Sequence, residues 1–175
     1  TASLGSDSYV GASAATHSVT APLVDSVNAG LAGASATAVS LCYSTASNGG
    51  TPALDPAKVA GKIVVCDRGT TARVDKSLAV LEAGGVGMIL VNPSNSTLNA
   101  DFHSVPTVHL QNTAYAAVHA YAATLGATAT LSKAYVDLSA PAADPDPGSP
   151  VWSQPPWGVA TARSDKPGGS TSPRC

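Results

Sequence analysis

The side chains that could support catalysis gather in one short stretch, Asp101-Phe102-His103-Ser104. A carboxylate, an imidazole and a hydroxyl are the three groups of a hydrolase triad, which must converge in space. Near neighbours on one extended stretch do not converge in this way. Asp101 and His103 could instead supply two metal ligands, but no third ligand stands at a helpful spacing. A hydrogen-bonded loop is therefore the favoured interpretation.

Two kinds of glycine-rich segment suggest other chemistry. Ala83-Gly84-Gly85-Val86-Gly87 has the glycines of a phosphate-binding loop, but such a loop follows a strand and opens a helix, whereas this segment follows a predicted helix. Residues 11–15 and 33–37 approach the Gly-x-Ser-x-Gly nucleophile elbow, but both lack its second glycine. The residues thus predict no self-sufficient active site, and no metal or cofactor is expected.

The cysteines favour a disulfide over a metal site. The three cysteines fit no four-ligand zinc pattern, and none forms a Cys-x-x-Cys pair. Cys42 and Cys66 each end a predicted strand and stand 24 residues apart. A disulfide between them would be worth roughly 3 kcal/mol. The alternative is two small buried hydrophobic side chains, and Cys175 is expected to be free.

Composition excludes several classes of function. The 175 residues carry a net charge of -2, and 11% are charged, against roughly 25% in an average soluble domain. Nucleic-acid binding and binding to a membrane surface both need clustered Lys and Arg, which this sequence lacks. No apolar run approaches the ~20 residues of a membrane span. We therefore expect no nucleic-acid partner and no membrane span.

Several features point to an exported protein. A low-charge surface rich in Ser, Thr and Gly is compatible with export, where a disulfide persists. Asn95-Ser96-Thr97 is a sequon for N-linked glycosylation, which matters only in a cell that glycosylates. No signal peptide is visible after Thr1, so the chain is expected to be a piece of a longer protein or a processed product. A secreted or extracellular location is expected.

A strand–helix–strand unit is predicted over residues 61–91. Lys62 to Cys66 is a β-branched run typical of a buried strand, and Val86 to Val91 is a second one. Between them, Val74, Leu78 and Leu81 recur at helical spacing and predict the buried stripe of a helix. Gly84-Gly85 ends this helix. Charged residues fall off the stripe: Arg73, Asp75, Lys76 and Glu82.

Shorter patterns predict the remaining elements. Strands are expected at 8–10, 22–24, 38–43, 106–110 and 127–131, with a polar loop over 92–104. Asn112 is expected to cap a second helix, which Gly126 ends. The buried face of that helix is predicted to carry Tyr115, Val118, Ala122 and Leu125. His109 and His119 are interpreted as partly buried structural residues rather than ligands.

Composition also divides the chain. Residues 1–20 are predicted to be a weakly ordered N-terminal strand and lead-in, 21–138 the ordered domain, and 139–175 a tail or linker rich in Pro, Gly and Ser. Proline blocks helix and central strand alike, and few apolar residues remain to offset the entropy of ordering, so the tail is predicted to be disordered. Trp152 and Trp157 could dock on a partner, but two isolated aromatics in the tail are the favoured interpretation.

The organised part of the sequence resembles a protease-associated (PA) domain, over about residues 20–136. The resemblance rests on collinear motifs: Leu54 to Gly69 with Cys66-Asp67-Arg68-Gly69, Arg73-Val74-Asp75-Lys76-Ser77, Ala83-Gly84-Gly85-Val86-Gly87-Met88-Ile89-Leu90-Val91-Asn92, and Ala100-Asp101-Phe102-His103-Ser104-Val105-Pro106-Thr107. It is closest to PA domains inserted in subtilisin-like serine proteases (peptidase family S8). Ala142-Ala143-Asp144-Pro145 departs from the segment such proteases place there, so a truncated or frame-shifted copy is expected.

The resemblance implies a mixed α+β fold, an open β-barrel or sandwich of six or seven strands flanked by two or three short helices. It implies a non-catalytic module of a secreted subtilisin-like protease, which influences substrate access or recognition, or self-association, beside the catalytic domain of the parent chain. The subtilase Asp-[Ser/Thr]-Gly, His-Gly-Thr and Gly-Thr-Ser-Met motifs are absent, so no catalytic residue carries over. The alternatives are a receptor-type PA domain that captures peptides alone, the PA insert of a zinc aminopeptidase, and an independent enzyme using Asp101, His103 and Ser104.

The polar loop and the strand after it form the predicted binding site, because binding usually resides in loops on a rigid frame. Phe102, the only Phe in the chain, either plugs the end of the barrel or contacts a ligand from the solvent side. Unpaired main-chain groups along Thr107–Leu110 would let an extended peptide add to the sheet. The predicted site for a peptide or protein substrate is Asp101, Phe102, His103, Thr107, Val108 and His109.

Overall fold

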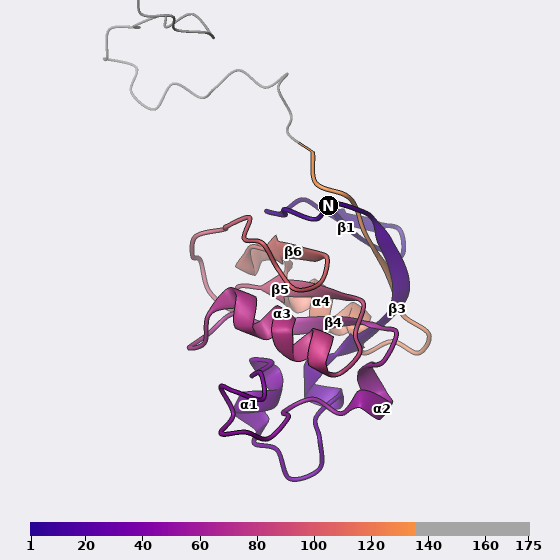
Figure 1. The fold of residues 1–175 in the computed structure, drawn as a ribbon. Coiled ribbons are helices and arrows are strands. Elements are labelled where there is room, and N and C mark those ends of the chain that lie inside the picture. Colours follow the sequence, from indigo (N-terminus) through magenta and orange to yellow (C-terminus); the bar gives the residue numbers. More distant parts are fainter. Residues whose placement is uncertain (136–175) are drawn as a thin grey trace, which may run out of the picture. The chain divides into compact units, whose positions relative to one another are not determined.

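The computed structural model describes residues 1–135 (Figure 1). The strands are β1 (Ala2–Leu4), β2 (Asp7–Tyr9), β3 (Val19–Asp25), β4 (Ile63–Asp67), β5 (Gly87–Val91), β6 (Thr107–Leu110) and β7 (Thr128–Leu131). The helices are α1 (Ala36–Ser40), α2 (Pro56–Val59), α3 (Arg73–Glu82) and α4 (Tyr115–Ala122), with 3-10 turns η1 (Ser26–Asn28) and η2 (Asn112–Ala114). The predictions made for 139–175, including Trp152, Trp157 and Cys175, lie outside the described residues. No helix within residues 1–135 is long and apolar enough to cross a membrane.

The seven strands form one mixed sheet in the order β2-β1-β7-β3-β4-β5-β6. Strands β3 to β6 are parallel, and β1, β2 and β7 join antiparallel. The predicted strand–helix–strand unit is β4-α3-β5, whose two strands pair in parallel from Ile63–Gly87 to Asp67–Val91. Seven strands with short helices confirm the mixed α+β class, although residues 1–135 contain four α-helices rather than two or three.

The central strands are buried on both faces, which explains their continuous apolar sequence. Side chains alternate across the sheet, so Val64, Cys66, Met88 and Leu90 face α3, which covers them with Ala79, Val80 and Ala83. The opposite face carries Ile63, Val65, Ile89 and Val91, which pack with Val118 and Ala122 of α4 and with β1 and β7. Figure 1 shows α3 and α4 on opposite sides of the β4–β5 pair.

The N-terminal residues differ from the predicted lead-in. Strands β1 and β2 form a hairpin whose Ala2 and Leu4 are buried in the core, and β1 pairs with β7, the last strand within residues 1–135. The composition of 1–20 did not reveal this, because Ser, Ala and Gly give a weak strand signal even where tertiary pairing decides the structure.

The prediction of a strand over 38–43 was wrong. Residues 36–40 form α1, because Ser35 is an N-cap whose side chain accepts a hydrogen bond from the Ala38 amide at 3.1 Å. The helix ends at Leu41, and Cys42 then takes a φ of 47°, a left-handed conformation that is uncommon outside glycine. An alanine-rich run with one cap forms a helix where the apolar residues of 38–43 suggested a strand.

The predicted buried stripe of α3 was also wrong, although the helix itself is confirmed. Val74, Leu78 and Leu81 are 43%, 37% and 49% exposed, while Lys76, Ser77, Ala79 and Val80 are buried. Small side chains let α3 lie close to the sheet. The Lys76 ammonium is satisfied inside by the Leu41 carbonyl at 2.5 Å and the Thr71 hydroxyl at 3.0 Å. Burial lowers the pKa of Lys76 to about 8.

In the second helix, Val118 and Ala122 are buried as predicted, but Leu125 lies beyond α4 and is fully exposed. The expected cap, Asn112, instead begins the 3-10 turn η2, whose cap is Gln111.

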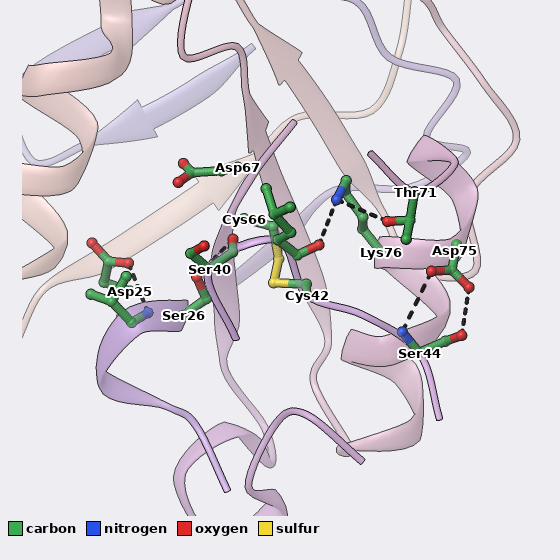
Figure 2. Close-up of a disulfide and its surroundings, with 12 residues drawn as sticks. Asp25, Ser26, Ser40, Cys42, Ser44, Cys66, Asp67, Thr71, Asp75 and Lys76 are labelled. Carbon is green, nitrogen blue, oxygen red and sulfur yellow. Dashed lines mark hydrogen bonds between the residues drawn. A yellow bond between two sulfur atoms is a disulfide. The ribbon is translucent and has the colours of Figure 1, made fainter. Parts of the chain in front are cut away.

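The predicted disulfide is present between Cys42 and Cys66, both of which are fully buried. It joins the segment after α1 to β4, and Figure 2 shows Lys76 and Asp75 of α3 beside it. Asp75 accepts a hydrogen bond from the Ser44 hydroxyl, and Glu82 accepts from the Thr45 amide at 2.8 Å. The segment 41–45 is therefore fixed both to the sheet and to α3.

Removing this disulfide is expected to lower the free energy of unfolding by roughly 3 kcal/mol, because the cross-link closes a loop of 24 residues. The variant Cys42→Ala/Cys66→Ala should unfold at a lower denaturant concentration than the oxidised chain, with a non-reduced digest of the latter showing the Cys42–Cys66 peptide. Equal unfolding midpoints, or two free thiols in oxidised protein, would contradict this prediction.

Candidate functional site

The loop over 92–104 joins β5 to β6, and a hydrogen-bond network around His109 fixes its start. His109 is fully buried, and its Nε2 lies 2.8 Å from the Asn92 side-chain oxygen, while its Nδ1 accepts from the Asn99 amide at 3.3 Å. The Asn92 amide nitrogen in turn donates to Gln111 Oε1 at 3.0 Å and to the Ser96 carbonyl at 3.2 Å. Since Nδ1 accepts, the imidazole is neutral with its proton on Nε2. Burial lowers the pKa of His109 to about 4.

The far half of the loop is attached to the start of α3. The guanidinium of Arg73 binds Asp101 through two of its nitrogens, Nε and a terminal nitrogen, the latter at 3.2 Å. This geometry is the strong bidentate form of the ion pair. The Arg73 hydrogen bond lowers the pKa of the Asp101 carboxyl and raises that of Arg73. Asp101 is therefore a fixed, paired charge that orients the loop.

His103 and Ser104 both bind Ser77 of α3. The Ser77 hydroxyl donates to the Val74 carbonyl at 2.7 Å, so its lone pairs accept from His103 Nδ1 and from the Ser104 amide, each at 3.1 Å. This assigns the His103 proton to Nδ1. Its Nε2 is buried and has no hydrogen-bond partner among residues 1–135, and burial lowers the pKa of His103. The imidazole is consequently neutral at physiological pH.

These contacts do not form a triad. Asp101 pairs with Arg73 rather than with His103, and His103 binds Ser77 rather than the Ser104 hydroxyl. The Ser77 hydroxyl donates its hydrogen bond to the Val74 carbonyl of its own helix rather than to a base, so it is not activated as a nucleophile. Among residues 1–135, no three His, Cys, Asp or Glu side chains are placed to hold a metal ion.

The edge of β6 is covered, contrary to the expectation of unpaired groups along it. His109 exchanges main-chain hydrogen bonds with Ala12 at 3.0 and 2.8 Å, and the Thr107 carbonyl accepts from the Ser13 hydroxyl at 2.7 Å. This close approach requires glycine at position 11, because a Cβ there would lie 2.3 Å from the His109 carbonyl oxygen. The segment after β2 thus occupies the place where a peptide was expected to pair.

A groove of about 250 Å³ lies between that segment and the loop. Residues 14–17 form one wall, and residues 101–107 form the other. Four of the six predicted site residues line it: Asp101, Phe102, His103 and Thr107. Val108 and His109 do not, because both are fully buried in the sheet. Phe102 is 89% exposed, so it lies on the solvent side rather than plugging the barrel.

The first wall of the groove was missed from the sequence. Residues 14–17 carry small or polar side chains and no chemical motif, and contacts with distant residues fix their position: the bridge at Ala12, the Ser13 hydroxyl and the Ala15 carbonyl, which accepts from the Ala134 amide. The single available signal was a glycine in a segment that otherwise looked unstructured.

A second polar cluster was also missed. His119 of α4 lies between two carboxylates at the carboxyl ends of β3 and β4, with Nδ1 2.6 Å from Asp25 and Nε2 3.0 Å from Asp67. The Tyr115 hydroxyl also donates to Asp67 at 3.2 Å. These hydrogen bonds raise the pKa of His119 to about 9, so the imidazole is a cation at neutral pH. All its polar atoms are satisfied within the cluster, which attaches α4 to the sheet.

Comparison with known proteins gives a consistent result. The family model of the PA domain matches residues 19–118. Subtilisin-like protease SBT5.3 of Arabidopsis thaliana is 39% identical over 107 residues, which cover 60% of this chain and 13% of that protein. Subtilisin-like protease SBT1.6 of the same organism is 46% identical over 71 residues, which cover 39% of this chain and 9% of that protein.

Among solved structures, an aminopeptidase from Aneurinibacillus sp. strain AM-1 shares the fold, with a TM-score of 0.52 and 23% identity over 75% of this chain and 29% of that one. The chain spans about a tenth of the length of the curated relatives named above. The family match covers more than half of the 175 residues and contains the strand–helix–strand unit, the disulfide and the loop of the groove. The chain belongs to the PA domain family.

Proposed function

We propose that this chain is a non-catalytic module of a secreted subtilisin-like serine protease, which binds extended segments of substrate and influences their access to the catalytic domain of the parent protein. The groove between 14–17 and 101–107 is the observation that carries the proposal. The curated relatives are subtilisin-like proteases many times longer than the matched segments, which supports a catalytic domain elsewhere in the parent.

The groove suits weak and tolerant binding. At about 250 Å³ it lies below the usual range of deep ligand pockets. The groove carries little net charge, because Asp101 is paired with Arg73 and the His103 imidazole is neutral. Recognition would therefore rest on apolar contact with the exposed Phe102 side chain, which tolerates many partner side chains. Since few net charges take part, affinity should depend little on salt.

The disulfide supports a secreted location for the module, because buried cystines persist in oxidising compartments. The partners in this proposal are a peptide or protein substrate and the serine protease catalytic domain of the parent chain.

Binding of peptides is expected to be weak, with a Kd on the order of 1 mM, and to be confined to the groove. Titration of the isotope-labelled chain with a mixture of unstructured peptides should shift backbone NMR signals of residues 14–17 and 101–107. Phe102→Ala should weaken binding several-fold without changing the unfolding midpoint, because this side chain is 89% exposed. Leu125→Ala is the matched control, since Leu125 is exposed outside the groove. Shifts confined to another surface would reject the site.

The purified chain is expected to show no turnover of peptide or ester substrates, because His103, Asp101 and Ser104 are not joined in a triad. Cleavage that is lost in His103→Ala would contradict this proposal and restore the enzyme alternative. Cleavage that survives His103→Ala would point to a contaminating protease.

A further inference from the structure

We infer that Asn95 is an acceptor site for an N-linked oligosaccharide. Asn95-Ser96-Thr97 satisfies the acceptor consensus, in which the hydroxyl residue stands two positions after the asparagine and the middle residue is not proline. Asn95 and Thr97 are both exposed in the loop that follows β5. The hydrogen bonds that hold this loop are made by Asn92, Ser96 and Gln111 and do not use the Asn95 side chain, so its modification leaves them intact.

Asn92 provides an internal contrast three residues earlier. It is fully buried, and its amide nitrogen donates to Gln111 and to the Ser96 carbonyl, so a sugar on this nitrogen would break the network that fixes the loop. Asn92 is also followed two positions later by a hydroxyl residue, Ser94, but Pro93 stands between them and blocks the consensus. No other asparagine of the chain has Ser or Thr two positions later. The acceptor consensus is thus absent at Asn92, which the fold requires, and present at Asn95, which is exposed.

Hydrogen bonds with Gln111 and Arg68 fix Ser96, the residue that follows Asn95. The Ser96 amide donates to Gln111 Oε1 at 3.2 Å, its carbonyl accepts from the Gln111 amide at 2.6 Å, and its hydroxyl accepts from Arg68. These contacts turn Ser96 toward the protein while its two neighbours remain exposed. A glycan on Asn95 would therefore project from an anchored loop and leave the folded core unchanged.

The chemistry is a transfer from a lipid-diphosphate-linked oligosaccharide. The Asn95 side-chain nitrogen forms a bond to C1 of the first sugar, and the bond between C1 and the diphosphate oxygen breaks. The lipid diphosphate leaves with the electron pair, and the amide proton passes to a base of the transferring enzyme. Such transfer takes place in the compartment where disulfides form, and the Cys42–Cys66 bond is compatible with passage through it. The inference rests on the secretory route of the proposed function and is independent of peptide binding.

The test is expression of the full 175-residue chain behind a secretory leader in a eukaryotic cell. The chain should migrate more slowly in a gel than its calculated mass predicts, and peptide-N-glycosidase should remove the shift and convert Asn95 to aspartate, as detected by peptide mass spectrometry. Asn95→Gln and Thr97→Ala should both abolish the shift. Thr97→Ser, which keeps the consensus, should retain it.

Protein from both the cell extract and the medium should be analysed. Because transfer of the oligosaccharide precedes export, the mobility shift can be measured even if secretion is slow. An unmodified Asn95 in chain that has lost its leader would overturn the inference, as would a shift that persists in Asn95→Gln. Failure of the peptide titration, carried out on unglycosylated bacterial protein, would leave this result untouched, so the two proposals fail separately.

Discussion

Replacing His119 with alanine is expected to destabilise the domain by about 3–5 kcal/mol at neutral pH, the usual cost of removing one partner from a buried ion pair. The substitution would leave Asp25, which is 4% exposed, and Asp67 without their shared cation. Asp25 would keep only the hydrogen bond from the Val27 amide at 3.2 Å. Denaturant unfolding of the variant and the parent chain, monitored by circular dichroism, measures the difference.

The same cluster predicts a loss of stability at alkaline pH. The pKa of His119 is about 9 in the folded state against about 6.5 in an unfolded chain, so the folded state holds the proton more tightly. The stabilisation is complete below pH 6.5 and disappears as the pH rises through 9. The Lys76 contribution to stability instead rises with pH above pH 8, because burial lowers its pKa and the folded state therefore loses this proton before the unfolded state does.

Comparison with His119→Gln separates the two contributions, because glutamine keeps an amide donor but does not titrate. The difference in unfolding free energy between the parent chain and this variant should shrink steadily from pH 6.5 to pH 9. A difference that stays constant over that range would show that His119 is not the cation between Asp25 and Asp67.

His109→Ala is expected to cost about 4 kcal/mol at neutral pH, because it removes a fully buried ring and leaves polar groups of Asn92 and Asn99 without partners. The pKa of His109 is about 4 when folded and about 6.5 when unfolded, so the unfolded state takes up the proton first as the pH falls. Stability should therefore decline from pH 6.5 toward pH 4, and the burial of His103 adds to this decline.

His109→Gln tests the acid limb, because glutamine can replace a donor and an acceptor without titrating. Its unfolding free energy should fall less steeply than that of the parent chain below pH 6.5. His17→Ala is the control, since this exposed side chain should change stability by no more than about 0.5 kcal/mol. Parallel acid limbs in the parent chain and His109→Gln would contradict the neutral, buried state of His109. Together the two histidines predict a stability maximum near pH 6.5.

The sequence by itself determined the family and the centre of the fold. The β-branched runs that became β4 and β5, the glycine-terminated helix between them and the Cys42–Cys66 pair were all predicted and are confirmed. The strands and the helix are each encoded by neighbouring residues within one element. The disulfide was predicted from two strand ends, although Cys42 follows a helix in the structure. The burial of both sheet faces also makes a continuous apolar run unambiguous.

Local periodicity gave a wrong prediction where a contact with a residue distant in sequence determined which side chains are buried. The helix α3 buries Lys76 rather than Leu78 because the Leu41 carbonyl, 35 residues away, accepts its ammonium. Residues 38–43 read as a strand, but the cap at Ser35 and the disulfide at Cys42 define a helix and its abrupt end.

Only the tertiary structure decided what lies beside the predicted loop. The first wall of the groove comes from residues 14–17, and His119 contacts Asp25, which stands 94 residues earlier in the sequence. Strand order and register bring these segments together, and both depend on the packing of the whole sheet. A pattern of neighbouring residues reports which face of an element is apolar, whereas it carries no information on which distant element will cover that face.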